Sequence, residues 1–258
     1  MKNFQILILI FLFTSCSKNQ NKELKQDNFP KLTNVKTVQS KFKNDTSVSR
    51  SSSNILYIGN LKDSIKLDFS LVEFPFAPPP PPFNDNGKLD TVESKKIITK
   101  FNQKFKSNPV YPYYLSWEKS QKFNAWDSSK VSIQVDTNTI TKQLVVNKNF
   151  QKEYYTAYPV LLKNEEQDTI RIGYDRFIPI ILEAKDSTNQ WKPIEKMFSF
   201  MCGNGLNSLI LPPKDIIVSS KVIYKGDYKT DLRIKMGNNY SNKFKGSINY
   251  SQFENSRY

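Results

Sequence analysis

The segment TDLRIKM, Thr230–Met236, alternates between polar and apolar side chains from Asp231 onward. Successive side chains of a β-strand point to opposite faces of the sheet. Leu232, Ile234 and Met236 therefore face a core, and the charged residues between them face water. This pattern predicts a strand whose sheet has one buried face and one solvated face.

Six further apolar runs precede this strand at short intervals, with turn residues between them. They are Thr156–Leu162, Thr169–Ile172, Phe177–Ala184, Trp191–Ile194, Ser208–Leu211 and Ile216–Ile223. Seven short strands without long helical periods predict two packed antiparallel sheets. We therefore expect an immunoglobulin-like β-sandwich over residues 148–236. Residues 237–258, rich in Asn, Ser and Tyr, are either a final strand or a flexible tail.

The sequence pattern over residues 54–147 predicts a smaller β-rich region that contains one helix. Its expected strands are Ile55–Ile58, Ile65–Leu71, Val131–Val135 and Ile140–Val146. The whole chain is therefore expected to be mainly β.

The helix of this region is expected over 91–105. Ile97, Phe101 and Phe105 recur every four residues, with Ile98 beside them, as on one face of an amphipathic helix. Such a face is expected to pack on a sheet.

A proline run, Pro78–Pro82, and a polar turn precede the helix. The prolines favour a stiff surface loop over a proline-rich ligand motif. Asn84–Glu93 partly resembles a calcium-binding EF-hand loop, but Pro82 stands where that loop has its leading aspartate. We therefore expect an ordinary turn that caps the helix, and no metal site.

Aromatic residues gather after the helix, and four of them are candidate binding residues. These are Tyr113, Tyr114, Trp117 and Trp126. Exposed aromatic rings stack on sugar rings, which would make a glycan platform, whereas tyrosine and tryptophan are also common core and sheet residues. The core interpretation is favoured over the platform.

The chain contains no histidine, which removes many common catalytic arrangements. Ser-His-Asp and Cys-His machinery is excluded, as are zinc sites that depend on histidine. We found no glycine loop for phosphate or dinucleotide, so no cofactor is expected. Cys202 is expected to be a small buried side chain and not a reactive thiol. No catalytic residue is assigned, and an enzyme is not expected.

The formal net charge is +14, from 38 basic and 24 acidic residues. Such a charge favours anionic partners such as phospholipid headgroups, lipopolysaccharide or other acidic polymers. A lysine-rich, well-solvated surface is an equally weighted alternative.

The N-terminus is expected to be a secretion signal. Lys2 precedes the apolar run 4–13, whose length of about ten residues is too short for a membrane-spanning helix of about 20 residues. The next residues, Phe13-Thr14-Ser15-Cys16, resemble the lipobox of bacterial lipoproteins. The resemblance covers only the first 16 residues and implies cleavage after residue 15 and lipid on Cys16. An ordinary signal peptide cut elsewhere, or a short uncleaved anchor, is the alternative.

Residues 16–53 are expected to be the lipidated cysteine and a disordered tether, because Ser, Asn, Lys, Gln and Thr dominate them. By resemblance to lipoprotein sorting rules, the absence of aspartate at position 17 favours an outer-membrane anchor that faces the periplasm. Nucleic acid is not an expected partner outside the cytoplasm.

The leading functional hypothesis is a non-enzymatic, membrane-anchored envelope lipoprotein that binds or scaffolds another envelope protein or an anionic polymer. The alternatives are an inhibitor or immunity-type protein against a toxin or hydrolase, and a carbohydrate-binding or carbohydrate-active protein.

Overall fold

A computed structural model of the chain describes residues 29–35, 40–47, 49–73, 80, 82–146, 151–175, 177–197 and 207–253. Cys16, Cys202 and most of the proline run lie outside these residues. Within them, no helix is long and apolar enough to cross a membrane.

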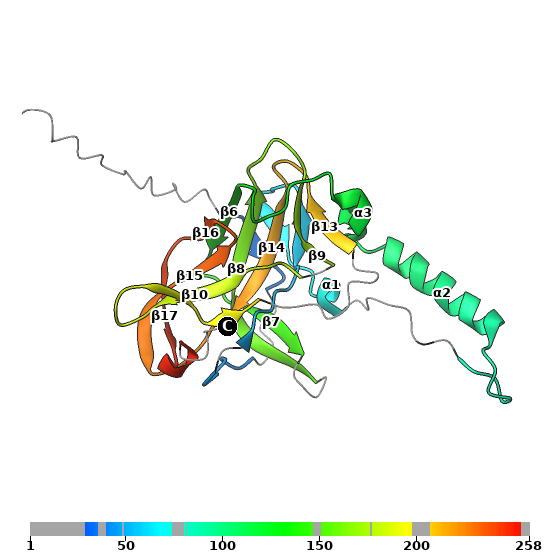
Figure 1. The fold of residues 1–258 in the computed structure, drawn as a ribbon, viewed down its shortest axis with the longest axis horizontal. Coiled ribbons are helices and arrows are strands. Elements are labelled where there is room, and N and C mark those ends of the chain that lie inside the picture. Colours follow the sequence, from blue (N-terminus) through cyan, green and yellow to red (C-terminus); the bar gives the residue numbers. More distant parts are fainter. Residues whose placement is uncertain are drawn as a thin grey trace, which may run out of the picture.

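The first large sheet is built around two long antiparallel strands, β8 and β14 (Figure 1). β3 flanks β14, while β6 and β7 pair with different parts of the other edge of β8. The strand bounds are β3 Tyr57–Gly59, β6 Val131–Val135, β7 Thr141–Val146, β8 Lys152–Asn164 and β14 Ile216–Val222. Strands expected in two regions on either side of residue 147 therefore share one sheet.

The second large sheet is centred on β15, the strand with the clearest alternation in the sequence. β10 and then β11 lie along one edge of β15, and β16 and β17 pair with β15 as well, all antiparallel. The strand bounds are β10 Ile181–Lys185, β11 Trp191–Pro193, β15 Tyr228–Met236, β16 Asn239–Tyr240 and β17 Phe244–Ile248. Residues 239–248 thus supply final strands, the first of the two alternatives for the C-terminal segment.

Smaller elements complete the fold. β5, β13 and β9 form a three-stranded antiparallel sheet, while β1 with β4 and β2 with β12 form short parallel pairs. Their bounds are β1 Lys31–Thr33, β2 Ser49–Arg50, β4 Ser64–Lys66, β5 Tyr114–Ser116, β9 Ile170–Tyr174, β12 Glu195–Lys196 and β13 Asn207–Leu211. The helical elements are α1 Ser70–Glu73, α2 Thr91–Lys106, η1 Tyr111–Tyr113, α3 Trp117–Ser120 and η2 Tyr250–Gln252.

One apolar core joins the two large sheets. Val160 and Ile217 of the first sheet are buried in the same cluster as Leu182 and Ile234 of the second. At its margin Tyr158 of β8 meets Phe244 of β17 edge to face, with ring centroids 5.8 Å apart. The prediction of a mainly β, sandwich-like fold with antiparallel sheets is confirmed.

β14 is buried along its whole length because both of its faces are covered. Ile217 faces the main core, whereas Ile216 and Val218 join a second cluster with Leu56 and Leu67. A strand covered on both sides needs apolar residues at consecutive positions, which explains the run of Ile216, Ile217 and Val218.

The expected tether is corrected at its C-terminal end, because residues before Asn54 already belong to the folded part. β1 pairs with β4, and β2 pairs with β12 from the second half of the chain. Phe29 and Leu32 pack against the second cluster, and Ser51 is buried. These apolar residues are too widely spaced to show a strand period, which is why composition alone predicted a tether.

The helix expected over 91–105 forms, but the prediction that it packs on a sheet was wrong. α2 projects away from the sandwich (Figure 1), and Ser94 is its one buried residue. A second correction concerns the run 65–71, where β4 ends at Lys66 and α1 begins at Ser70. The Asp68 carboxylate accepts a hydrogen bond from the Ser70 backbone N–H and so supports that turn.

Candidate functional site

The most enclosed polar cluster in the described residues is an ion pair between Lys221 of β14 and Glu195 of β12. Lys221 Nζ lies 2.5 Å from Glu195 Oε2, and the two side chains are 2% and 1% exposed. The Glu195 carboxylate also accepts hydrogen bonds from the Leu182 backbone N–H and the Tyr224 hydroxyl. Each charge is thus compensated, as burial in a low-dielectric interior requires.

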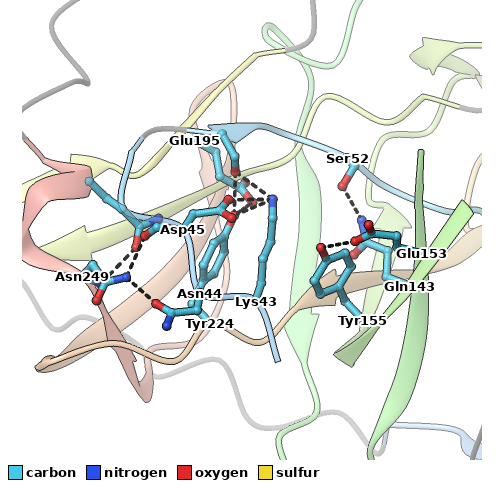
Figure 2. A network of polar contacts seen from close by, with 12 residues as sticks. Lys43, Asn44, Asp45, Ser52, Gln143, Glu153, Tyr155, Glu195, Tyr224 and Asn249 are labelled. Carbon is cyan, nitrogen blue, oxygen red and sulfur yellow. Dashed lines mark hydrogen bonds and ion pairs between the residues drawn. The ribbon is translucent and has the colours of Figure 1, made fainter. Parts of the chain in front are cut away.

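The network continues to the N-terminal segment (Figure 2). Ser49 Oγ lies 2.9 Å from the Tyr224 hydroxyl, and Lys43 Nζ donates to Ser49 Oγ over 2.9 Å. Lys43 also pairs with Asp45 at 3.0 Å. Lys43 and Ser49 are therefore joined by polar contacts to Tyr224, which follows β14 and donates a hydrogen bond to Glu195 of β12.

The environment of this cluster shifts its ionisation strongly. Burial lowers the pKa of Lys221, and the nearby Glu195 carboxylate opposes that shift. Burial also raises the pKa of Tyr224 well above its ordinary value. Shifted groups of this kind can mark an active site. Here Lys221, Glu195 and Tyr224 are almost fully buried and bonded to one another, so a substrate has no access to them, and their role is structural.

A second cluster is accessible and lies on the outward face of the second large sheet. Strand register places cations and aromatic rings there side by side, because Lys185 is opposite Trp191 and Lys235 is opposite Tyr240. We call this surface the cationic face. Its residues are Lys185, Trp191, Arg233, Lys235, Tyr240 and Lys245.

Arg233 is the centre of the cationic face. Its guanidinium carbon lies 4.3 Å from the ring centroid of Trp191 and 4.0 Å from that of Tyr240, so the two rings sandwich the cation. Arg233 Nε and Nη2 both lie 2.7 Å from Glu183 Oε2. These contacts hold Arg233 and both rings in fixed positions.

The cationic face keeps an excess of positive charge around this stack. Glu183 is shared by Arg233 and Lys235, whose ammonium lies 3.6 Å from the carboxylate. Asp231 is shared by Lys185 and Lys245. The hydrogen bond from Lys245 holds the pKa of the Asp231 carboxyl below its usual value. Two carboxylates are thus paired with four cations, which leaves a net positive charge on this face.

A hollow of about 820 Å³ opens at one end of the cationic face. Lys235 belongs to both the cationic face and the hollow. The hollow is lined by Trp126, Asp127, Ser128, Ile181, Met197, Lys235, Gly237 and Asn238. Gly237 has a φ of +57°, and a side chain there would collide with the backbone of Asp127, so only glycine keeps this wall closed. The volume is in the range of pockets that hold small ligands.

Three of the four aromatic residues considered as a binding platform, Tyr113, Tyr114 and Trp126, are partly buried and pack against the main core, as the favoured interpretation expects. The Tyr113 hydroxyl donates to Asp215 Oδ2 over 3.2 Å, and Tyr114 stacks on Phe105 with ring centroids 5.8 Å apart. Trp117 is exposed beside Tyr174 and Arg171. Trp126 alone of the four lines the hollow.

Sequence reasoning missed the partners that make the cationic face. The alternation of Thr230–Met236 correctly pointed Arg233 and Lys235 to the solvent side of the sheet. Trp191 and Tyr240 were not singled out, because only the register of β10, β11 and β16 brings them to Arg233.

Among the described residues, no group of three or more acidic, cysteine or histidine side chains is arranged to hold a metal ion. Comparison of the chain with family models, with curated proteins and with solved structures gave no match.

Proposed function

We propose that this protein is a non-enzymatic, lipid-anchored lipoprotein of the bacterial envelope that binds an anionic envelope polymer through its cationic face. The observation that carries the proposal is the stack of Trp191, Arg233 and Tyr240, with Lys185, Lys235 and Lys245 around it. The lipobox-like residues before Cys16 support the anchor.

The chemistry of the cationic face fits a polymer that carries both negative groups and flat apolar ring surfaces. Ammonium and guanidinium groups bind phosphate, sulfate or carboxylate groups, and the tryptophan and tyrosine rings offer contact area to sugars. The adjacent hollow, with Trp126 in its wall, would take a larger unit of the same polymer.

Binding of the full-length protein to lipopolysaccharide and to dextran sulfate, with neutral dextran for comparison, tests the cationic face. The triple variant Lys185→Gln, Lys235→Gln, Lys245→Gln should bind both anionic polymers about tenfold more weakly and with a shallower dependence on salt. These substitutions keep Arg233 and its Glu183 partner intact, so the sheet should remain folded.

A matched control removes the same charge elsewhere. Lys62, Lys66 and Lys119 are exposed and lie outside the cationic face. The variant Lys62→Gln, Lys66→Gln, Lys119→Gln should bind as the wild type does. Equal weakening in both variants would mean that net charge alone drives binding, and the proposed site would be rejected.

The anchor needs a separate experiment, because its failure would not affect the cationic face. Intact mass and membrane fractionation in a bacterial host should show a lipid-sized mass increase and membrane association that both vanish in Cys16→Ala. A soluble wild type of unmodified mass would overturn the lipoprotein part of the proposal.

A further inference from the structure

The helix α2 and the turn before it, residues 82–106, form a projecting arm. The 16 residues of α2 give a length of about 24 Å. Figure 1 shows the arm directed away from the sheets, with the turn at its far end. At the near end, buried Val110 and the stacking of Phe105 on Tyr114 join the arm to the folded body.

The far end of the arm, 82–92, has a defined structure. Phe83 and Leu89 form an antiparallel bridge, and Asn84 Oδ1 accepts hydrogen bonds from the backbone N–H groups of Asn86 and Lys88. Asp90 caps α2 by accepting from the N–H groups of the first turn. The side chains at the tip are therefore presented by an ordered turn.

This ordered tip exposes large apolar side chains to solvent. Phe83, Val92 and Leu89 are 69%, 64% and 47% exposed, and Phe83 and Val92 are the most exposed of the large hydrophobic residues in the described chain. Ile98, further along α2, is exposed as well. Exposure of single apolar residues is ordinary, but three at one projecting end mark an interaction surface.

The same arm is strongly cationic. α2 contains five lysines and one glutamate. The lysines are Lys95, Lys96, Lys100, Lys104 and Lys106, and Lys88 lies in the turn beside the exposed Phe83 and Leu89. On a helical projection Lys95, Lys96 and Lys106 lie on the side opposite Ile97, Phe101 and Phe105, and Lys100 and Lys104 flank that apolar stripe. Apolar side chains with a cationic helix behind them match the chemistry of an anionic lipid surface.

We propose that the arm docks on an anionic phospholipid bilayer. Phe83, Leu89 and Val92 enter the interface between headgroups and acyl chains, and the lysines of α2 and Lys88 lie among the phosphates. The docking surface is separate from the cationic face, so it does not depend on the polymer proposed there.

A bilayer fits this surface better than a folded protein does. A stable protein interface buries about 1,200 Å² or more, usually with complementary polar groups. The tip offers three apolar side chains, two on the turn and Val92 at the start of α2, with lysines nearby. A bilayer accepts such a shape because its surface deforms around the inserted side chains and its charge is spread over many headgroups.

Co-sedimentation of the full-length protein with vesicles tests the proposal, comparing phosphatidylglycerol-containing vesicles with phosphatidylcholine vesicles. Phe83→Ser, Leu89→Ser, Val92→Ser should lower the partition coefficient on anionic vesicles about tenfold or more. Lys88→Gln, Lys95→Gln, Lys100→Gln should abolish most of the preference for anionic lipid. Residues 1–28 are common to all variants, so the differences report on the arm alone.

Two further measurements make the result decisive. Leu61→Ser, Ile140→Ser removes two apolar side chains, 47% and 45% exposed, from elsewhere on the molecule, and this variant should bind as the wild type does. In Phe83→Trp, quenching by brominated lipid should exceed that of the wild type, because position 83 enters the bilayer. Unchanged partition of the tip variant, an equal loss in the Leu61 and Ile140 variant, or no added quenching at position 83 would each overturn the proposal. Binding of the full-length protein to an acidic protein through the tip, without binding to vesicles, would overturn it too.

Discussion

The network around Glu195 and the arm both contain lysines, which are buried in the network and exposed to solvent in the arm. Lys221 is buried and pairs with Glu195, and Lys43 reaches the same network through Ser49 and Tyr224. The lysines of α2 stand on a projecting helix in which Ser94 is the one buried residue. In the network, each lysine has fixed partners, whereas in the arm the charges are spread along a solvated surface.

The difference shows how burial decides what a charge does. A buried ammonium has lost its water, so its partner becomes essential to the folded state. A solvated ammonium contributes little to folding and keeps its charge available to an outside partner. The network should therefore control stability, and the arm should control binding.

The largest effect is expected from breaking the buried pair. Glu195→Ala leaves Lys221 without its counter-charge and removes the acceptor of Tyr224 and Leu182. The free energy of unfolding, measured by urea denaturation, should fall by about 3–5 kcal/mol. The double variant Glu195→Leu, Lys221→Met removes both charges and should be markedly more stable than Glu195→Ala. A loss below about 1 kcal/mol in Glu195→Ala would show that the buried pair is not essential to the folded state.

A smaller effect is expected at high pH where the arm meets the body. Burial, and then the charge of Asp215, raise the pKa of Tyr113 to about 12. The unfolded chain loses this proton near its ordinary pKa of about 10, so stability is complete below that pH and is lost as pH rises towards 12. Urea midpoints measured across this window should fall less steeply in Tyr113→Phe. Tyr57, Tyr155 and Tyr224 also have raised pKa values and will contribute to the part of the slope that remains. An unchanged slope would mean that Tyr113 does not contribute to the loss of stability at high pH.

Removing the helix cap should affect the arm alone. Asp90→Ala loses the hydrogen bonds to the Val92 and Glu93 N–H groups and should destabilise the first turn of α2 by about 1 kcal/mol. Hydrogen exchange of those amides should quicken, while the urea midpoint of the whole protein stays the same. Asp85→Ala removes an equal charge from the exposed turn and should leave the exchange rates as they are. A shift of the global midpoint in Asp90→Ala would mean that the arm unfolds together with the sandwich.

The smallest effect on stability is expected from the arm lysines. Lys100→Gln should change the free energy of unfolding by less than about 0.5 kcal/mol at any salt concentration. Salt should nevertheless weaken vesicle binding, since the Debye length falls from about 10 Å at 0.1 M to about 3 Å at 1 M. The destabilisation in Glu195→Ala should persist at high salt, because a buried pair is poorly screened. Equal salt sensitivity in the two measurements would remove the distinction between the regions.

Local patterns in the sequence predicted much of the sandwich. The alternation in Thr230–Met236 and in Val131–Val135 assigned both strands and their buried faces, since a strand repeats every two residues whatever it pairs with. The turn before α2 and the extent of that helix also followed from neighbouring residues, because caps and helical periodicity act over a few positions. The alternation in Thr230–Met236 also predicted that Arg233 and Lys235 of β15 face solvent.

The tertiary structure alone decided where these pieces lie. Residues 40–53 have the composition of a tether, yet Lys43 and Ser51 are buried because Tyr224 and Lys196, far away in the chain, supply their partners. The apolar stripe of α2 was expected to meet a sheet, yet the helix projects from the body. Trp191 and Tyr240 reach Arg233 only through the register of three strands. Short-range periodicity is set by backbone geometry, whereas burial and pairing depend on which distant segments arrive to replace water, and that is decided only when the whole chain has folded.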